Sequence, residues 1–317
     1  MPILQRRSLI LAKIEGAGAY ATDVLTTSTG TEAILVRNFD ATPLNATTVN
    51  RDLVRSYLGN SEQLLSSTSS AISFEVELAG SGAAGTAPKY DPILQACALA
   101  PTATASVSVV YNPVSTGIRS ATIYANLDGV LHKFLGCRGT VTMSCQLGQI
   151  PTLKFELTSL YTTPTDTTQL APTYSLQATP LVFRQGNTST FSLFGLTTLL
   201  LQSVEFSVAN ETIYRELIST PAVKEVLIID RKPAGTVVIE APLMATRNFF
   251  NDATSDTTGS LSFLHGTTPG NRVTFTAGQI DISAPSYSEM DQVMMLNIPF
   301  VAVPTTAGNN EFSLSFT

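Results

Sequence analysis

The chain of 317 residues has few of the residues on which catalytic and metal sites most often depend: no tryptophan, two histidines and three cysteines. His132 and His265 lie far from each other in the sequence, without the spacing of metal ligands. Cys97, Cys137 and Cys145 form no C-x-x-C pair, and three cysteines cannot all pair within one chain. We therefore expect no metal site and three small apolar side chains in a reducing compartment.

Charge and long apolar runs are also scarce. Only 13% of the residues are charged, against about 25% in typical domains, so the polar surface must consist largely of Ser, Thr, Asn and Gln. Such a surface suits contacts between copies. The net charge of −6 argues against nucleic-acid binding, which needs basic clusters. Lys13 and Glu15 interrupt the N-terminal apolar run, which is shorter than the roughly 7 residues of a secretion signal, and no segment reaches the roughly 18 of a membrane span. We expect synthesis in the cytoplasm, where the protein stays soluble, without membrane insertion.

Short alternations of apolar and polar residues between turn residues dominate the sequence and predict β-strands. They occur at 33–39, 71–79, 106–111, 121–127, 139–145, 152–160, 190–195, 203–208, 226–230, 235–241, 260–266, 272–283, 293–303 and 311–316. Helices are predicted only at 91–100 and 242–253, each near a proline, which the first turn of a helix tolerates.

The order of elements indicates an internal repeat. In the first half, 51-RDLV-54 precedes a strand that ends near Glu77, and a short helix follows. In the second half, 215-RELI-218 precedes a strand that ends at Glu240, again followed by a helix. The predicted fold class is mainly β, with two tandem β-sandwich or β-barrel domains, each with one short α-helix.

The domain boundaries follow from a Thr- and Pro-rich segment typical of a linker. We place an N-terminal arm at 1–30, the first domain at 31–160, the linker at 161–181 and the second domain at 182–317. The arm has an apolar face but no core element nearby, so we expect it to pack on another subunit.

A glycine motif in 74-FEVELAGSGAAGTAP-88 matches the G-x-G-x-x-G of dinucleotide-binding turns. Such a site needs a helix to begin at the last glycine, so that its N–H groups bind pyrophosphate. Pro88 and Pro92 delay the helix, and no acidic residue follows about 20 residues later. We interpret the glycines as a flexible connection from an edge strand to a short helix, and we expect no cofactor.

Two carboxylates, Glu75 and Glu77, share one face of a strand. They suit either a catalytic pair or the polar side of an amphipathic strand whose Phe74, Val76 and Leu78 pack inside. The sequence has no G-x-S-x-G, H-E-x-x-H or P-loop motif. We therefore predict that the protein is not an enzyme.

Three longer phrases carry a family resemblance: 33-AILVRNFDATPLNATTVNRDLVRSYLGNSEQLL-65, 128-DGVLHKFLGCRGTV-141 and 229-IDRKPAGTVVIEAP-242. Together they resemble the major tail tube proteins of long-tailed, non-contractile bacteriophages (siphophages), over essentially the whole chain. The resemblance implies rings that stack into a hollow virion tail, which conducts DNA into the host. Family members with one domain form hexameric rings, so a tandem chain is expected to form trimers with pseudo-sixfold symmetry.

The resemblance also implies partners and assembly loops. The partners are other copies of the chain, the tape measure, terminator and distal tail proteins at the tube ends, and genomic DNA that passes without specific binding. In this family a long hairpin loop projects to the neighbouring ring. Residues 40–70 and 209–234 occupy that place, and we expect 40–70 to lack structure until it orders on a partner. Their charged candidates for ring stacking are Arg51, Asp52, Arg55, Glu62, Arg215, Glu216, Lys224, Glu225, Arg231 and Lys232.

A tube that conducts DNA needs a wall that does not bind phosphate. Strand alternation groups the candidates for such a wall: Glu75, Glu77, Lys154, Glu156, Glu240 and Asp281. Alternation shows which residues share a face, but not whether that face meets the lumen or the outside. Two other classes fit parts of the sequence: a β-rich virion surface protein, such as a capsid decoration protein or an adhesin that forms no tubes, and an enzyme with a deep polar pocket.

Overall fold

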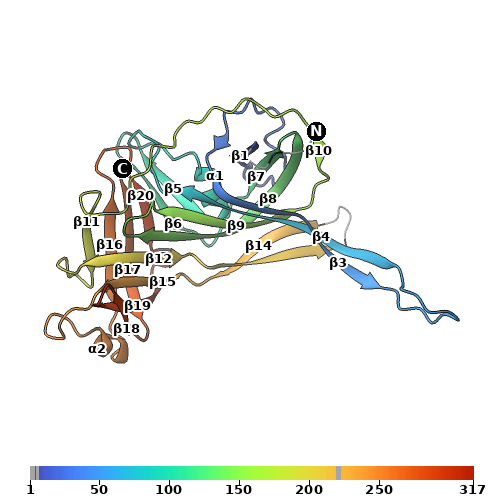
Figure 1. The fold of residues 1–317 in the computed structure, drawn as a ribbon. Coiled ribbons are helices and arrows are strands. Elements are labelled where there is room, and N and C mark those ends of the chain that lie inside the picture. The colour runs from blue at the N-terminus through green and yellow to red at the C-terminus, as the bar shows by residue number, and fades with distance from the viewer. Residues whose placement is uncertain (1–3, 5–6, 219–222) are drawn as a thin grey trace.

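The structure is a computed structural model that describes residue 4 and residues 7–218 and 223–317. Strands account for 52% of the chain and helices for 4%, which confirms the mainly β class. Figure 1 shows a layered β body from which one long hairpin projects far to one side.

One antiparallel sheet, here the main sheet, contains strands from both halves of the chain. Its spatial order is β3 (Arg37–Asn50), β4 (Gln63–Glu77), β9 (Thr152–Leu160), β8 (Val130–Gln146), β12 (Leu201–Ser207), β15 (Ala234–Glu240) and β19 (Val293–Ala302). Beyond β19 lie β18 (Ser286–Met290) and the end of β17 (Val273–Ile282). The β8–β12 ladder joins the two halves.

A second sheet packs over the main sheet. Its order is β5 (Leu99–Thr104), β6 (Ser108–Pro113), β20 (Ser313–Phe316), β17, β16 (Gly259–His265) and β11 (Thr188–Leu193). A smaller group next to the first half consists of β1 (Ser8–Ile14), β2 (Ala33–Ile34), β7 (Ala121–Leu127), the start of β8 and β10 (Thr165–Asp166).

The core lies between the layers and follows from strand alternation. In β9, and in β4 from Ser70 onward, every second side chain is buried, including Phe74, Val76 and Phe155, and the centres of the Phe74 and Phe155 rings are 5.8 Å apart. In the second half the Phe206 ring lies 4.8 Å from that of Phe275. Burial of aromatic side chains is a large favourable contribution to folding.

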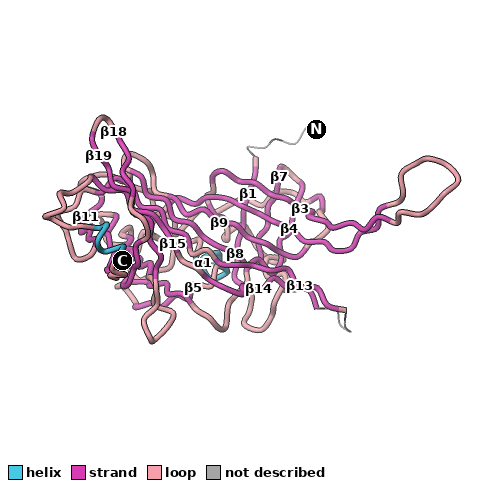
Figure 2. Tube along the Cα trace, turned by 90° about the horizontal axis from the view of Figure 1, so that it is seen from below, coloured by secondary structure: helices cyan, strands magenta, loops and turns pink. Residues whose placement is uncertain are grey.

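Two hairpins leave the body at the same end (Figures 1 and 2). The first hairpin is β3–β4, and its tip loop comprises residues 51–62. The second hairpin is β13 (Asn210–Leu217) with β14 (Val223–Arg231), which continue β12 and β15. The prediction that 40–70 lacks structure is therefore wrong, because residues 40–50 belong to β3 and residues 63–70 to β4.

The two predicted helices are present but shorter. α1 (Asp91–Ala96) has a proline in its first turn, and the chain enters β5 three residues after it ends. α2 (Phe249–Thr254) begins directly after Asn248. The Asn248 side chain accepts a hydrogen bond from the Asn251 N–H and so caps the helix.

The N-terminal segment differs from the expectation. β1 pairs with β7 along its whole length, and Leu9–Ala12 are buried, so this segment packs within its own chain. Residues 161–181 also lie against the first half: Thr173 donates to the Gly30 carbonyl and Ala178 to that of Gly80.

The glycine motif is a tightly packed crossing and not a flexible connection, and β4 is not an edge strand, because it lies between β3 and β9. A Cβ on Gly80 would lie 2.1 Å from the Gly270 carbonyl oxygen, and one on Gly85 2.3 Å from the Ser106 nitrogen. Gly80 and Gly85 therefore allow two backbone segments to approach closely.

Candidate assembly surfaces

One face of the main sheet packs in the core and the other is polar. Antiparallel cross-strand partners share a face, so the polar face can be traced by register. One row crosses the sheet from β3 to β17 through Arg37, Glu75, Lys154, Thr142, Ser207, Ala234, Val301 and Asp281. Two residues from opposite halves, Glu75 and Asp281, thus lie on one face.

The other candidates for the tube wall lie on the same face. Glu77 and Glu156 are two residues from members of that row, and Glu240 alternates with the buried Val237 and Ile239. The structure therefore places all six predicted residues on the polar face.

Three further charged residues, which strand alternation did not predict, lie on the same face. Arg37 and Asp40 pair in register with Glu75 and Ser73, and Glu205 with Ser144. Alternation in the predicted strand 203–208 could have identified Glu205. With the six candidates, these residues comprise seven acids and two bases, a net charge of −5. Arg138 also points to this side from β8, but it donates to the Val226 carbonyl of β14, which covers it.

Ion pairs on this face leave most acids without a basic partner. Arg37 lies 3.8 Å from Glu75, and Lys154 lies 2.6 Å from Glu156. The hydrogen bond with Glu156 raises the pKa of Lys154 above its usual range, so Lys154 stays charged. Among the described residues, Glu77, Glu205, Glu240 and Asp281 have no ion pair. The second hairpin lies over the polar face at the end from which both hairpins project. There Glu156 of β9 and Thr212 of β13 line one hollow.

The first hairpin carries four of the predicted stacking residues in or beside its tip loop. Arg51 lies 3.4 Å from Glu62 across the base of the loop. Asp52 has a positive φ of +24°, and the Arg55 guanidinium lies 5.9 Å from the centre of the Tyr57 ring. Arg55 has no carboxylate partner in the described part of the chain.

The second hairpin pairs most of its own charges. Arg215 pairs with Glu225, and Lys224 lies 2.7 Å from Glu216. The hydrogen bond from Lys224 lowers the pKa of Glu216, so this exposed pair stays charged at neutral pH. Lys232 lies 3.0 Å from Asp230 near the base.

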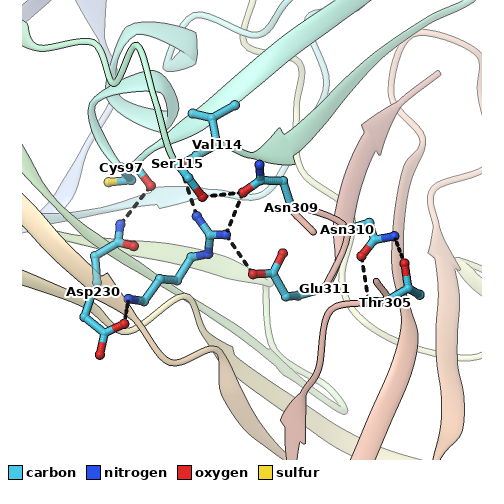
Figure 3. A network of polar contacts seen from close by, with 10 residues as sticks. Cys97, Val114, Ser115, Asp230, Thr305, Asn309, Asn310 and Glu311 are labelled. Carbon is cyan, nitrogen blue, oxygen red and sulfur yellow. Dashed lines mark hydrogen bonds and ion pairs between the residues drawn. The ribbon is translucent and has the colours of Figure 1, made fainter. Parts of the chain in front are cut away.

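A polar network anchors the base of the second hairpin (Figure 3). Arg231 donates to Glu311 over 2.7 Å, to the Val114 carbonyl over 3.1 Å and to Asn309 over 3.2 Å. Asn210 donates to the carbonyls of Cys97 and Gly139, each over 2.8 Å. Arg231 and Lys232 thus lie at the base and not at the tip, and Arg231 makes internal contacts with Glu311 and the Val114 carbonyl.

Other features of the structure bear on alternative functions. A cavity of about 270 Å³ next to β1 is lined mainly by leucines and threonines. No group of His, Cys, Asp or Glu among the described residues could hold a metal ion. Neither short helix in the described ranges has the length and apolar character needed to cross a membrane. All three cysteines are free and buried.

Comparison with known proteins gives one family. Residues 5–302 match the model of the family described as phage tail tube protein. A search of curated protein sequences finds no match.

Proposed function

Because the chain belongs to the phage tail tube protein family, it is a structural, non-enzymatic component of the virion tail, and we propose that it builds the tube of a long-tailed, non-contractile phage from stacked rings. The tube conducts genomic DNA without specific binding. Its ends meet the tape measure, terminator and distal tail proteins.

The observation that carries the ring proposal is that the main sheet has unpaired edges on opposite sides. In the described ranges, β3 pairs only with β4, and β18 pairs only with β19. Exposed edge strands are templates for further pairing. Pairing between the edges of neighbouring copies continues the main sheet from chain to chain and closes it into a ring.

The proposal of three chains per ring rests on the likeness of the two halves. β4 is the second strand of the first hairpin, and β15 follows the second strand of the second hairpin. β4 ends at Glu77, and β15 ends at Glu240. Each then pairs with the last long strand of its half, β9 or β19, and a short helix follows each. Three such chains provide six similar units, which gives pseudo-sixfold symmetry.

The polar face of the main sheet is proposed as the wall of the lumen. Its net negative charge supports this assignment, because duplex DNA carries about one negative charge per 1.7 Å and is retained by basic surfaces. The hairpins are proposed to carry stacking, since both project from the same end of the body.

Electron microscopy of the concentrated, purified protein tests this function. We expect tubes of stacked rings with three chains in each ring and the main sheet innermost. Particles that form no rings at any concentration contradict the tube proposal and favour a surface role. Tubes with six whole chains per ring contradict only the proposed stoichiometry.

A further inference from the structure

The tip loop of the first hairpin and a pair of hollows lie at opposite ends of the molecule. β4 runs from the tip loop to Glu77, which pairs with Thr152 at the start of β9. The same end of the main sheet contains Gln146, Leu201 and Glu240, as successive ladders show. Strand register alone therefore places the ends of β8, β12 and β15 far from residues 51–62.

The tip loop exposes apolar side chains that nothing in the described chain covers. Val54 and Leu58 are fully exposed, with relative exposures of 102% and 103%, and Leu53 and Tyr57 are largely exposed. Contiguous exposed apolar residues on a protruding element mark an interaction site. Burial of these aliphatic side chains in a contact removes apolar surface from water and so favours association.

The opposite end has two hollows that are lined by leucines together with polar residues. Two adjoining hollows, of about 500 Å³ and about 240 Å³, share Leu147, Leu200 and Leu201 as lining residues. Leu147 and Leu200 are themselves exposed. Glu240 and Asp291 also line the smaller hollow. We call this pair the leucine hollow.

We propose that the tip loop of one copy inserts into the leucine hollow of a copy in the next ring, where Val54 and Leu58 contact Leu147 and Leu200. Charge complementarity favours this occupant in the smaller hollow: Arg55 lacks a carboxylate partner in the described chain, and Glu240 and Asp291 line that hollow, whereas Arg184 lines the larger one. The proposal rests on the proposed function, because it assigns the surface that receives the stacking hairpin.

The two surfaces also account for open-ended growth. They differ from each other and lie at opposite ends, so the contact is heterologous: each copy inserts its tip loop in one neighbour and receives the tip loop of another. A heterologous contact without rotational closure produces a filament. Rings closed by edge pairing would therefore stack without limit along one axis.

Crosslinking with a short bismaleimide tests the contact. The doubly substituted chain Leu58→Cys/Leu200→Cys is compared with Leu58→Cys/Val107→Cys, whose second thiol is also exposed but lies in the turn between β5 and β6. The native cysteines are buried and do not compete. We expect assembled tubes of the first variant to give a ladder of covalent multimers on a denaturing gel. Each single-cysteine variant and the Val107 control should remain at least ten times less crosslinked.

The outcomes separate this proposal from the proposed function. Tubes of the Leu58/Leu200 variant that give no more multimers than the control overturn the contact and leave the tube function intact. Wild-type protein that forms no tubes overturns both. A complementary variant, Leu200→Asp, should form rings that do not stack, whereas Val107→Asp should stack normally; normal stacking of Leu200→Asp likewise overturns the contact.

Discussion

Arg231 donates a hydrogen bond to the Glu311 carboxylate over 2.7 Å, and only 11% and 8% of the two side chains are exposed. The pair joins the base of the second hairpin to the segment before β20. Because a buried ion pair depends on both partners, removal of one leaves an uncompensated charge.

We expect Arg231→Ala to lower the free energy of unfolding at neutral pH by about 3 kcal/mol, because Glu311 then remains buried without its partner. Urea denaturation provides the measurement. The double variant Arg231→Ala/Glu311→Ala should lose less than the sum of the two single variants. Additive losses would show that the pair is not coupled.

Alternation predicted the strands that have one buried face. The expected strands 121–127 and 152–160 agree with β7 and β9 residue for residue. β1 was missed because both of its faces are covered: Ile10 and Ala12 face the main core, whereas Leu9 and Leu11 belong to a second apolar cluster. A strand buried on both sides is continuously apolar and does not alternate.

Most of β3 and all of β13 were missed for the opposite reason. Most residues of β3 are exposed on both faces, so apolar alternation is absent and only the ladder with β4 defines the strand. Within the candidate site, alternation correctly grouped Glu75 with Glu77 on one face. It could not show that Arg231 is buried against Glu311, because that contact joins residues far apart in the sequence.

Gly80 and Gly82 should respond differently to substitution by alanine. A Cβ on Gly80 meets the Gly270 carbonyl oxygen, which is backbone and cannot move away alone, whereas a Cβ on Gly82 has open space and faces only its φ of +90°. We expect Gly80→Ala to lower the melting temperature more than Gly82→Ala, whose cost is about 1–2 kcal/mol.

The same glycine motif should bind no nucleotide. Titration calorimetry with NAD, FAD and ATP should show no heat of specific binding. Micromolar binding that Gly82→Val abolishes would instead identify a nucleotide site.

Acid should destabilise the protein partly through Asp23. Burial raises the pKa of this carboxyl, but hydrogen bonds from Tyr124 and Lys133 outweigh burial and lower the pKa below its ordinary value. A lowered folded pKa stabilises the protein above the unfolded value of about 3.9, and this contribution is lost as the pH falls through the folded pKa. Asp23→Asn should therefore melt at a lower temperature than wild type at pH 7, with the difference shrinking below about pH 4. A difference that is independent of pH would show that the ionised form is not responsible.

Charge reversal in the tip loop should stop tube growth without unfolding the chain. Arg51 is already paired with Glu62, but Arg55 is available to a neighbouring ring. We expect Arg51→Glu/Arg55→Glu to give folded rings that do not stack, as seen by electron microscopy and circular dichroism. The matched control is Arg51→Glu/Glu62→Arg, which preserves the pair in reversed order and should stack. Normal tubes from the first variant would remove these charges from the mechanism.

The sign of the net charge on the polar face should affect the rate of DNA release. Glu75 and Glu77 belong to the face that we assign to the lumen, where acids outnumber bases. Changing both residues to lysine should permit tail assembly but slow DNA ejection, because a basic wall holds phosphate by releasing counterions. The effect should be larger at low salt, where the Debye length increases from about 10 Å at 0.1 M to about 30 Å at 0.01 M. Glu75→Gln/Glu77→Gln is the control that removes charge without reversing it, and it should eject DNA at nearly the wild-type rate. Ejection at the wild-type rate from the lysine variant, or a tube structure with both glutamates on the outer wall, would contradict the assignment.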